Sequence, residues 1–152
     1  MITDTARYHG SFFTLLLENV TRPVMLQKLS KKGSGLYLIN EVTPIALKMT
    51  TKRVGPWTFN FMRSHQENHN ELYEQYGDFY VCLVCGRDGI VGLSMPELRT
   101  VLDDKFEEQE SVSVRRRLKT MYRVTGRDGV LDKRVSRRSI FTKIEQSIAR
   151  EI

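Results

Sequence analysis

The stretch DFYVCLVCGRDGIVGLSMPELRTVL, residues 78–102, decides the fold. It opens with an almost continuous apolar run over residues 79–85, which is typical of a strand covered on both faces in the centre of a sheet. A glycine-containing turn then leads into a second, shorter apolar run. Ser94 followed by Glu97 has the spacing of a helix capping box. The stretch therefore predicts a central strand, a neighbouring strand and a helix.

Periodicity predicts the elements on either side of this stretch. Apolar residues recur every three or four positions near both ends of the chain, which favours helices there. Large apolar residues recur at every second position over 45–50 and 57–62, which predicts two strands that pair with each other in antiparallel fashion. The predicted helices are residues 6–19, 65–76, 94–102 and 139–151, and the predicted strands are residues 24–29, 36–40, 45–50, 57–62, 79–85, 90–93, 112–118, 121–124 and 130–135.

Together these elements predict one α/β domain of the α+β type, with a mixed, mostly antiparallel sheet flanked by helices. Residues 1–110 would form an αβββαβ-like core. Residues 111–152 would add a basic β-hairpin and helix that pack on the same domain. A chain of 152 residues with 40% hydrophobic residues is large enough to bury one core of its own.

The sequence Gly-Arg-Asp-Gly occurs twice, at residues 86–89 and 126–129. The flanking residues do not match. Because Asp-Gly is common at the centre of two-residue hairpin turns, we interpret the two copies as similar turns rather than as an internal repeat.

The net charge of +6 is concentrated in the C-terminal part of the chain. Residues 111–152 contain 12 Lys or Arg against 4 Asp or Glu, and most of the basic residues are arginines. Guanidinium groups bind phosphate oxygens in a two-pronged geometry, so we predict non-catalytic binding of DNA or RNA through phosphate contacts. The predicted binding residues are Arg115, Arg116, Arg117, Lys119, Arg123, Arg134, Arg137 and Arg138, with Lys48, Lys52 and Arg53 as a second patch on the outer face of the predicted strand pair.

Three alternatives stay open at this point. The basic segment is also consistent with a solvated surface, or with one that pairs with the acidic residues of 103–110. A protein-binding module is a second possibility: an inhibitor, an immunity protein or a complex subunit with an acidic partner, or a homodimer joined through the C-terminal helix. A divergent metal-dependent nuclease is the third.

His65, His69, Cys82 and Cys85 have a spacing that suggests zinc. Geometry argues against this site, because residues three apart in a strand point to opposite faces and cannot share an ion. We therefore expect the two cysteines to be buried core thiols, and whether the four residues bind zinc is left open.

Several classes of function lack their signatures. The sequence has neither a Gly-x-Ser-x-Gly elbow nor a glycine-rich phosphate loop, which argues against serine hydrolases of that type and P-loop NTPases. Apolar runs such as residues 12–17 and 79–85 are too short to cross a membrane, and the N-terminus does not have the pattern of a leader peptide. We expect a cytoplasmic protein that does not contact membranes, and we predict no cofactor and no metal.

The order helix, three strands, helix, strand over residues 5–93 resembles the core of the PD-(D/E)XK, or restriction-endonuclease-like, nucleases. In that family a first-helix glutamate, a strand aspartate and a Glu-x-Lys motif surround a divalent metal. By this resemblance Glu18 would take the first role, and Lys48 or Lys52 the last. Glu41 is the only acidic residue between positions 19 and 66, and it lies outside the predicted strands. The resemblance therefore implies at most a member that binds nucleic acid without cutting it.

Overall fold

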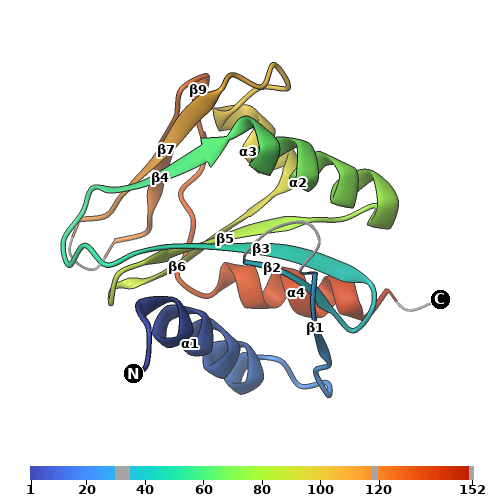
Figure 1. Ribbon diagram of the computed structural model, residues 1–152. Helices are drawn as coiled ribbons and strands as arrows, with labels where there is room; N and C mark the ends of the chain where they lie inside the picture. Colours follow the sequence, from blue (N-terminus) through green and yellow to red (C-terminus); the bar gives the residue numbers. More distant parts are fainter. Residues whose placement is uncertain (30–34, 118–119, 151–152) are drawn as a thin grey trace.

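The computed structural model describes residues 1–29, 35–117 and 120–150 of the chain. These residues form four helices and nine strands, and the predicted α+β fold class is confirmed (Figure 1). No helix among them is both long enough and apolar enough to cross a lipid bilayer. In chain order the elements are α1 (Asp4–Asn19), β1 (Leu26–Lys28), β2 (Leu36–Ile39), β3 (Thr43–Thr50), β4 (Trp57–Met62), α2 (Arg63–Tyr76), β5 (Tyr80–Cys85), β6 (Gly89–Ser94), α3 (Met95–Val101), β7 (Gln109–Arg115), β8 (Arg123–Gly126), β9 (Gly129–Val130) and α4 (Ser139–Ile148).

The larger sheet has five strands in the order β1-β2-β3-β5-β6. Its neighbours are antiparallel except for β3 and β5, which run parallel because α2 carries the chain back between them. Every residue of β5 is buried. The prediction that residues 79–85 form a central strand covered on both faces is therefore confirmed, and so is the capping box of Ser94 and Glu97 at the start of α3.

The predicted pairing of β3 with β4 is wrong. Strand β4 belongs instead to a second, antiparallel sheet with the order β4-β7-β8-β9, in which Trp57 lies opposite Val114. The physical reason is that both edges of β3 are occupied, one by β2 and the other by β5, so that no hydrogen-bonding edge is left for β4.

The five-stranded sheet lies between two further layers (Figure 1). Helices α1 and α4 cover one face, where Phe12, Leu16 and Ile144 belong to one hydrophobic cluster. The second sheet and helices α2 and α3 cover the other face, and Phe61 and Leu98 contribute to the cluster there. The expectation that Lys48 lies on an outer face of the strand pair is therefore wrong, because the second sheet packs over that face of β3.

Residues from 111 onward are part of the same packed structure. Strand β7 pairs with β4 over residues 109–114. Ile140, Ile144 and Ile148 recur every four positions, which favours a helix over 139–151, and all three are buried on α4. The strand expected over residues 130–135 is shorter: β9 ends at Val130, and a single bridge joins Tyr122 to Val135. Leu118, Lys119 and the last two residues of the chain lie outside the described residues.

Both copies of Gly-Arg-Asp-Gly join antiparallel strands, but their second glycines are not turn residues. Gly89 pairs with Cys85, and Gly129 pairs with Gly126, so these glycines lie within strands. A Cβ atom at Gly89 would lie 2.4 Å from the hydroxyl of Tyr122, and one at Gly129 would lie 2.3 Å from the carbonyl oxygen of Thr100. Close approach, rather than a left-handed backbone, excludes a side chain at both positions.

Gly92 offers a test of how tightly α4 packs on the sheet. A Cβ atom there would lie 2.2 to 2.4 Å from three side-chain atoms of Ile140, whereas one at Gly10 in α1 would have no atom within 4 Å. We predict that Gly92→Ala lowers the free energy of unfolding by about 1 to 3 kcal/mol. Gly10→Ala should raise it by about 0.5 to 1 kcal/mol. Urea denaturation measures both, and wild-type stability in the Gly92 variant would contradict this packing.

Candidate functional site

Five of the predicted arginines converge on one hollow of about 630 Å³. They come from the end of β7, the start of β8 and the segment after β9. The opposite wall is the loop that connects β3 to β4, through Val54, Gly55 and Pro56. None of the described residues that line the hollow is acidic. Its arginines are Arg115, Arg116, Arg117, Arg123 and Arg134.

A second hollow of about 430 Å³ adjoins the first one and shares Arg116, Thr120 and Met121 with it. Arg137 and Arg138 line this second hollow. Seven of the eight predicted C-terminal residues therefore lie around two neighbouring depressions, and the eighth, Lys119, is outside the described residues. We call the seven arginines the arginine surface.

Asp88 holds the base of the arginine surface in place. Its carboxylate accepts hydrogen bonds from Nε of Arg116 at 2.8 Å, from Nη2 of Arg116, and from the hydroxyl of Tyr122 at 2.6 Å. Its backbone carbonyl accepts a hydrogen bond from Arg137. These bonds hold the pKa of Asp88 below its usual range, and the bond from Arg116 has the largest effect. Burial acts in the opposite direction. Arg116 is thus committed to a structural ion pair.

The other arginines are available for ligands. The side chains of Arg115, Arg117, Arg123, Arg134 and Arg138 make no ion pair with any carboxylate of the described residues, and all five residues are exposed. Arg115 and Arg123 lie directly opposite each other on β7 and β8, which brings two like charges together. Like charges held side by side without counterions favour the binding of an anion.

The predicted second patch is divided between two places. Nζ of Lys52 donates a hydrogen bond to the carbonyl of Pro56 at 3.0 Å, which places it at the rim of the larger hollow. Arg53 is an exposed residue of the same loop. Lys48 lies elsewhere, in a cleft of about 420 Å³ between β3, β4 and the start of α2.

Lys48 is a half-buried amine without an acidic partner among the described residues. Its Nζ donates a hydrogen bond to the carbonyl of Asn60 at 2.8 Å, lies 3.2 Å from Nδ1 of His65, and sits 4.6 Å from the centre of the Phe61 ring. Burial lowers its pKa to about 8. The described residues that line the cleft include His9, His65 and His69 but no carboxylate. The cleft thus lacks the acidic residues that a metal-dependent nuclease needs.

The residues with zinc-like spacing do not come together. Cys82 and Cys85 are free, buried thiols that belong to the hydrophobic clusters on opposite faces of the sheet, as the strand geometry predicted. His69 is buried against the ring of Phe79. Within the described part of the chain, the one group of His, Cys, Asp and Glu side chains close enough to share an ion is Asp103, Glu110 and Asp128, which the sequence analysis did not identify.

Comparison of the chain with family models, with curated proteins and with solved structures gives no match. The resemblance to PD-(D/E)XK nucleases therefore rests on element order alone. Glu18, its expected helix residue, is exposed on α1 and does not line the Lys48 cleft.

Replacement of Asp88 by asparagine tests its role beneath the arginines. At pH 7, Asp88→Asn should lower the free energy of unfolding by about 2 kcal/mol, because charge-assisted hydrogen bonds to Arg116 are lost. The pKa of Asp88 is lower in the folded protein, so its contribution is complete above about pH 5 and is lost as the pH falls below about 4. Denaturation of both proteins from pH 7 to pH 2.5 measures this. A stability difference that does not shrink in acid would contradict it.

The pKa of Lys48 can be measured directly. We expect the Cε resonance of Lys48, assigned with a Lys48→Arg variant, to titrate with a midpoint near pH 8. Because this pKa is lower in the folded protein than in the unfolded chain, the amine's contribution to stability should improve between about pH 8 and pH 10. A midpoint above pH 10 would show that the amine is solvated.

Proposed function

We propose that this protein binds DNA or RNA non-catalytically, through phosphate contacts on the arginine surface. One observation carries the proposal. Two adjoining hollows are lined by five exposed arginines that form no ion pair with a carboxylate of the described residues: Arg115, Arg117, Arg123, Arg134 and Arg138. Guanidinium groups bind phosphate oxygens in pairs of parallel hydrogen bonds, which favours arginine over lysine at such contacts.

The breadth of the arginine surface favours a polymer over a small anion. Its charges come from three segments of the chain, and Lys52 and Arg53 extend them onto the loop between β3 and β4. Several phosphates in a row would each meet a separate guanidinium group. Val54 and Met121, both exposed apolar side chains, lie among the charges and offer contact surface for a sugar or a base.

The described residues around the hollows support binding rather than cleavage. They include no histidine and no carboxylate, so no general base faces a bound phosphate. Phosphate contacts fix the position of a backbone and carry no base information. The proposed binding is therefore independent of nucleotide sequence.

An acidic protein is the rival ligand for the same arginines, in keeping with the protein-binding alternative. The two ligands differ in how their affinity for the arginine surface responds to salt. A nucleic acid releases condensed counterions when it binds. The logarithm of its binding constant therefore falls steeply and linearly with the logarithm of the salt concentration. The arginines that have no ion partners suit either ligand, and the steep salt response identifies the nucleic acid.

We predict that a fluorescent 20-nucleotide duplex or single strand binds the wild-type protein with a steep salt dependence. The double variant Arg115→Ala/Arg117→Ala should bind at least tenfold more weakly, with a salt slope smaller by about 2, because two phosphate contacts are lost. Fluorescence anisotropy between 50 and 300 mM KCl measures both quantities.

The matched control is Arg7→Ala/Arg22→Ala. This control also removes two positive charges, but from exposed positions that do not line the arginine hollows. Affinity and salt slope should stay close to those of the wild type. Equal losses in the two double variants, or a flat salt response in the wild type, would overturn the proposed function.

A further inference from the structure

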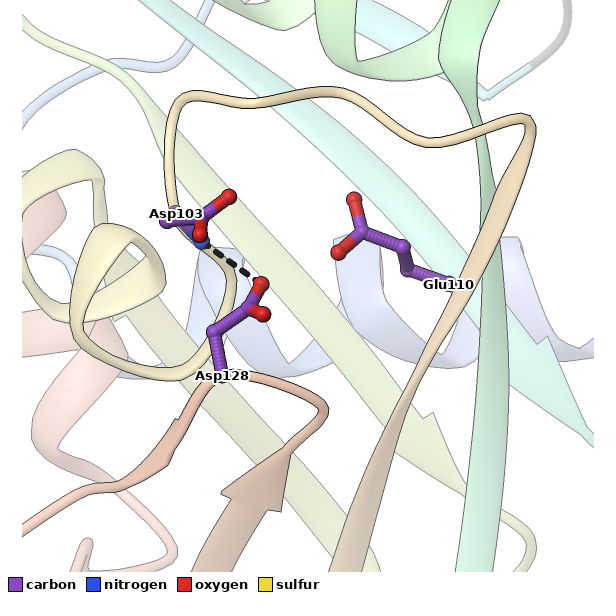
Figure 2. A group of neighbouring side chains, drawn as sticks. All are labelled: Asp103, Glu110 and Asp128. Atoms are coloured by element: carbon purple, nitrogen blue, oxygen red, sulfur yellow. Dashed lines mark hydrogen bonds between the residues drawn. The ribbon is translucent and has the colours of Figure 1, made fainter.

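Three carboxylates from distant parts of the sequence meet at one end of the second sheet (Figure 2). Asp103 follows α3, Glu110 lies in β7, and Asp128 lies in the turn between β8 and β9. One carboxylate oxygen of each lies within 4.8 Å of the others. Figure 2 shows the Glu110 side chain extending from its strand toward the two aspartates.

Glu110 provides an independent sign that a ligand belongs in this group. The residue is only 3% exposed. Its Oε2 accepts hydrogen bonds from Nε2 of Gln66 at 2.7 Å and from the backbone N–H of Glu107 at 3.4 Å. Its Oε1 is buried and has no hydrogen-bond partner. A buried carboxylate oxygen without a partner is costly, and a bound cation would compensate for that cost.

One guanidinium group lies near the carboxylates but forms no ion pair with them. Arg99 of α3 faces them, but its Nη1 donates hydrogen bonds to Oε1 of Gln66 at 2.9 Å and to the carbonyls of Leu102 and Asp103 at 3.3 and 3.1 Å. None of the three carboxylates forms an ion pair with a cation of the described residues. Burial, followed by the neighbouring Asp128, raises the pKa of Glu110.

The backbone around the carboxylates is held by hydrogen bonds. The N–H of Asp103 donates to Oδ2 of Asp128 at 3.0 Å, and the N–H of Asp128 donates to the carbonyl of Val101 at 2.9 Å. A Cβ atom at Gly126 would lie 2.3 Å from the same carbonyl, so the turn sits directly against the end of α3. A site that is held in place before its ligand arrives loses less entropy on binding.

From this arrangement we propose that Asp103, Glu110 and Asp128 bind a hard divalent cation of the Ca²⁺, Mg²⁺ and Mn²⁺ class. The three candidate ligands are all carboxylates, and all-oxygen ligand sets select hard cations over zinc or copper. One oxygen from each residue would ligate the cation, and water would complete its coordination. The cation would hold the end of α3, strand β7 and the β8–β9 turn together. This inference does not depend on the proposed function.

Calorimetric titration tests the site in the EDTA-treated, dialysed chain of 152 residues. CaCl₂, MgCl₂ and MnCl₂ are titrated separately at pH 7.5 and constant ionic strength, and the thermal midpoint is measured in parallel. At least one cation should bind with a stoichiometry of one and raise the midpoint in a concentration-dependent way. The net charge of +6 disfavours non-specific cation binding, which makes a single site easy to recognise.

Glu110→Gln and Asp128→Asn should each weaken binding at least tenfold. Glu107→Gln is the control, because Glu107 is an exposed carboxylate nearby that is not part of the group, and its variant should bind like the wild type. Mn²⁺ paramagnetic resonance of the wild type gives a readout that does not depend on whether a variant folds. The absence of binding by all three cations at 5 mM in the wild type overturns the inference, as does unchanged affinity in both site variants.

Discussion

The burial of β5 on both faces is the constraint on which the rest of the structure depends. An all-apolar strand in the interior of a five-stranded sheet requires a layer of structure over each face. Helices α1 and α4 cover one face, and the second sheet with α2 and α3 covers the other. The position of the second sheet follows from this requirement, and with it the position of the arginines on β7 and β8.

Asp88 connects this core to the arginine surface. It lies in the turn that follows β5, so its position is set by the most deeply buried strand of the protein. From there it accepts hydrogen bonds from Arg116 and from Tyr122, which is itself fully buried. One carboxylate thus anchors a guanidinium group and a core aromatic residue. The neighbouring arginines project from a framework that is already fixed, which reduces the entropy lost when they bind a ligand.

The sequence predicted well those features that depend on residues close together in the chain. It predicted poorly which strands from distant parts of the chain pair with each other. The buried run of β5, the capping box at Ser94 and the stripe of α4 depend on residues close in sequence, and all three predictions are confirmed. The alternation in β4 was recognised, but its partner was not, because periodicity identifies a strand without naming the edge it pairs with. For the same reason, the prediction placed Lys48 on the outer face of a strand pair that does not form.

The candidate sites show the same division. The arginines were found because they are concentrated in one part of the chain, and strand register then brings Arg115 opposite Arg123. The carboxylate group was missed because Asp103, Glu110 and Asp128 come from three elements and follow no motif spacing. The ion pair of Asp88 with Arg116 joins residues 28 positions apart, and only the folded sheet shows it.

The second sheet carries opposite charges at its two ends, and strand direction explains why. Strand β7 begins beside Glu110 and ends at Arg115, while the antiparallel β8 begins at Arg123 and runs toward the turn that holds Asp128. Glu110 and Arg115 are five positions apart in an extended strand, a distance of about 17 Å. Electrostatic interactions in physiological salt are screened over about 8 Å, so charge at one end has little effect on binding at the other. A cation among the carboxylates would therefore act on the arginine surface mainly by restraining the two strands that carry it.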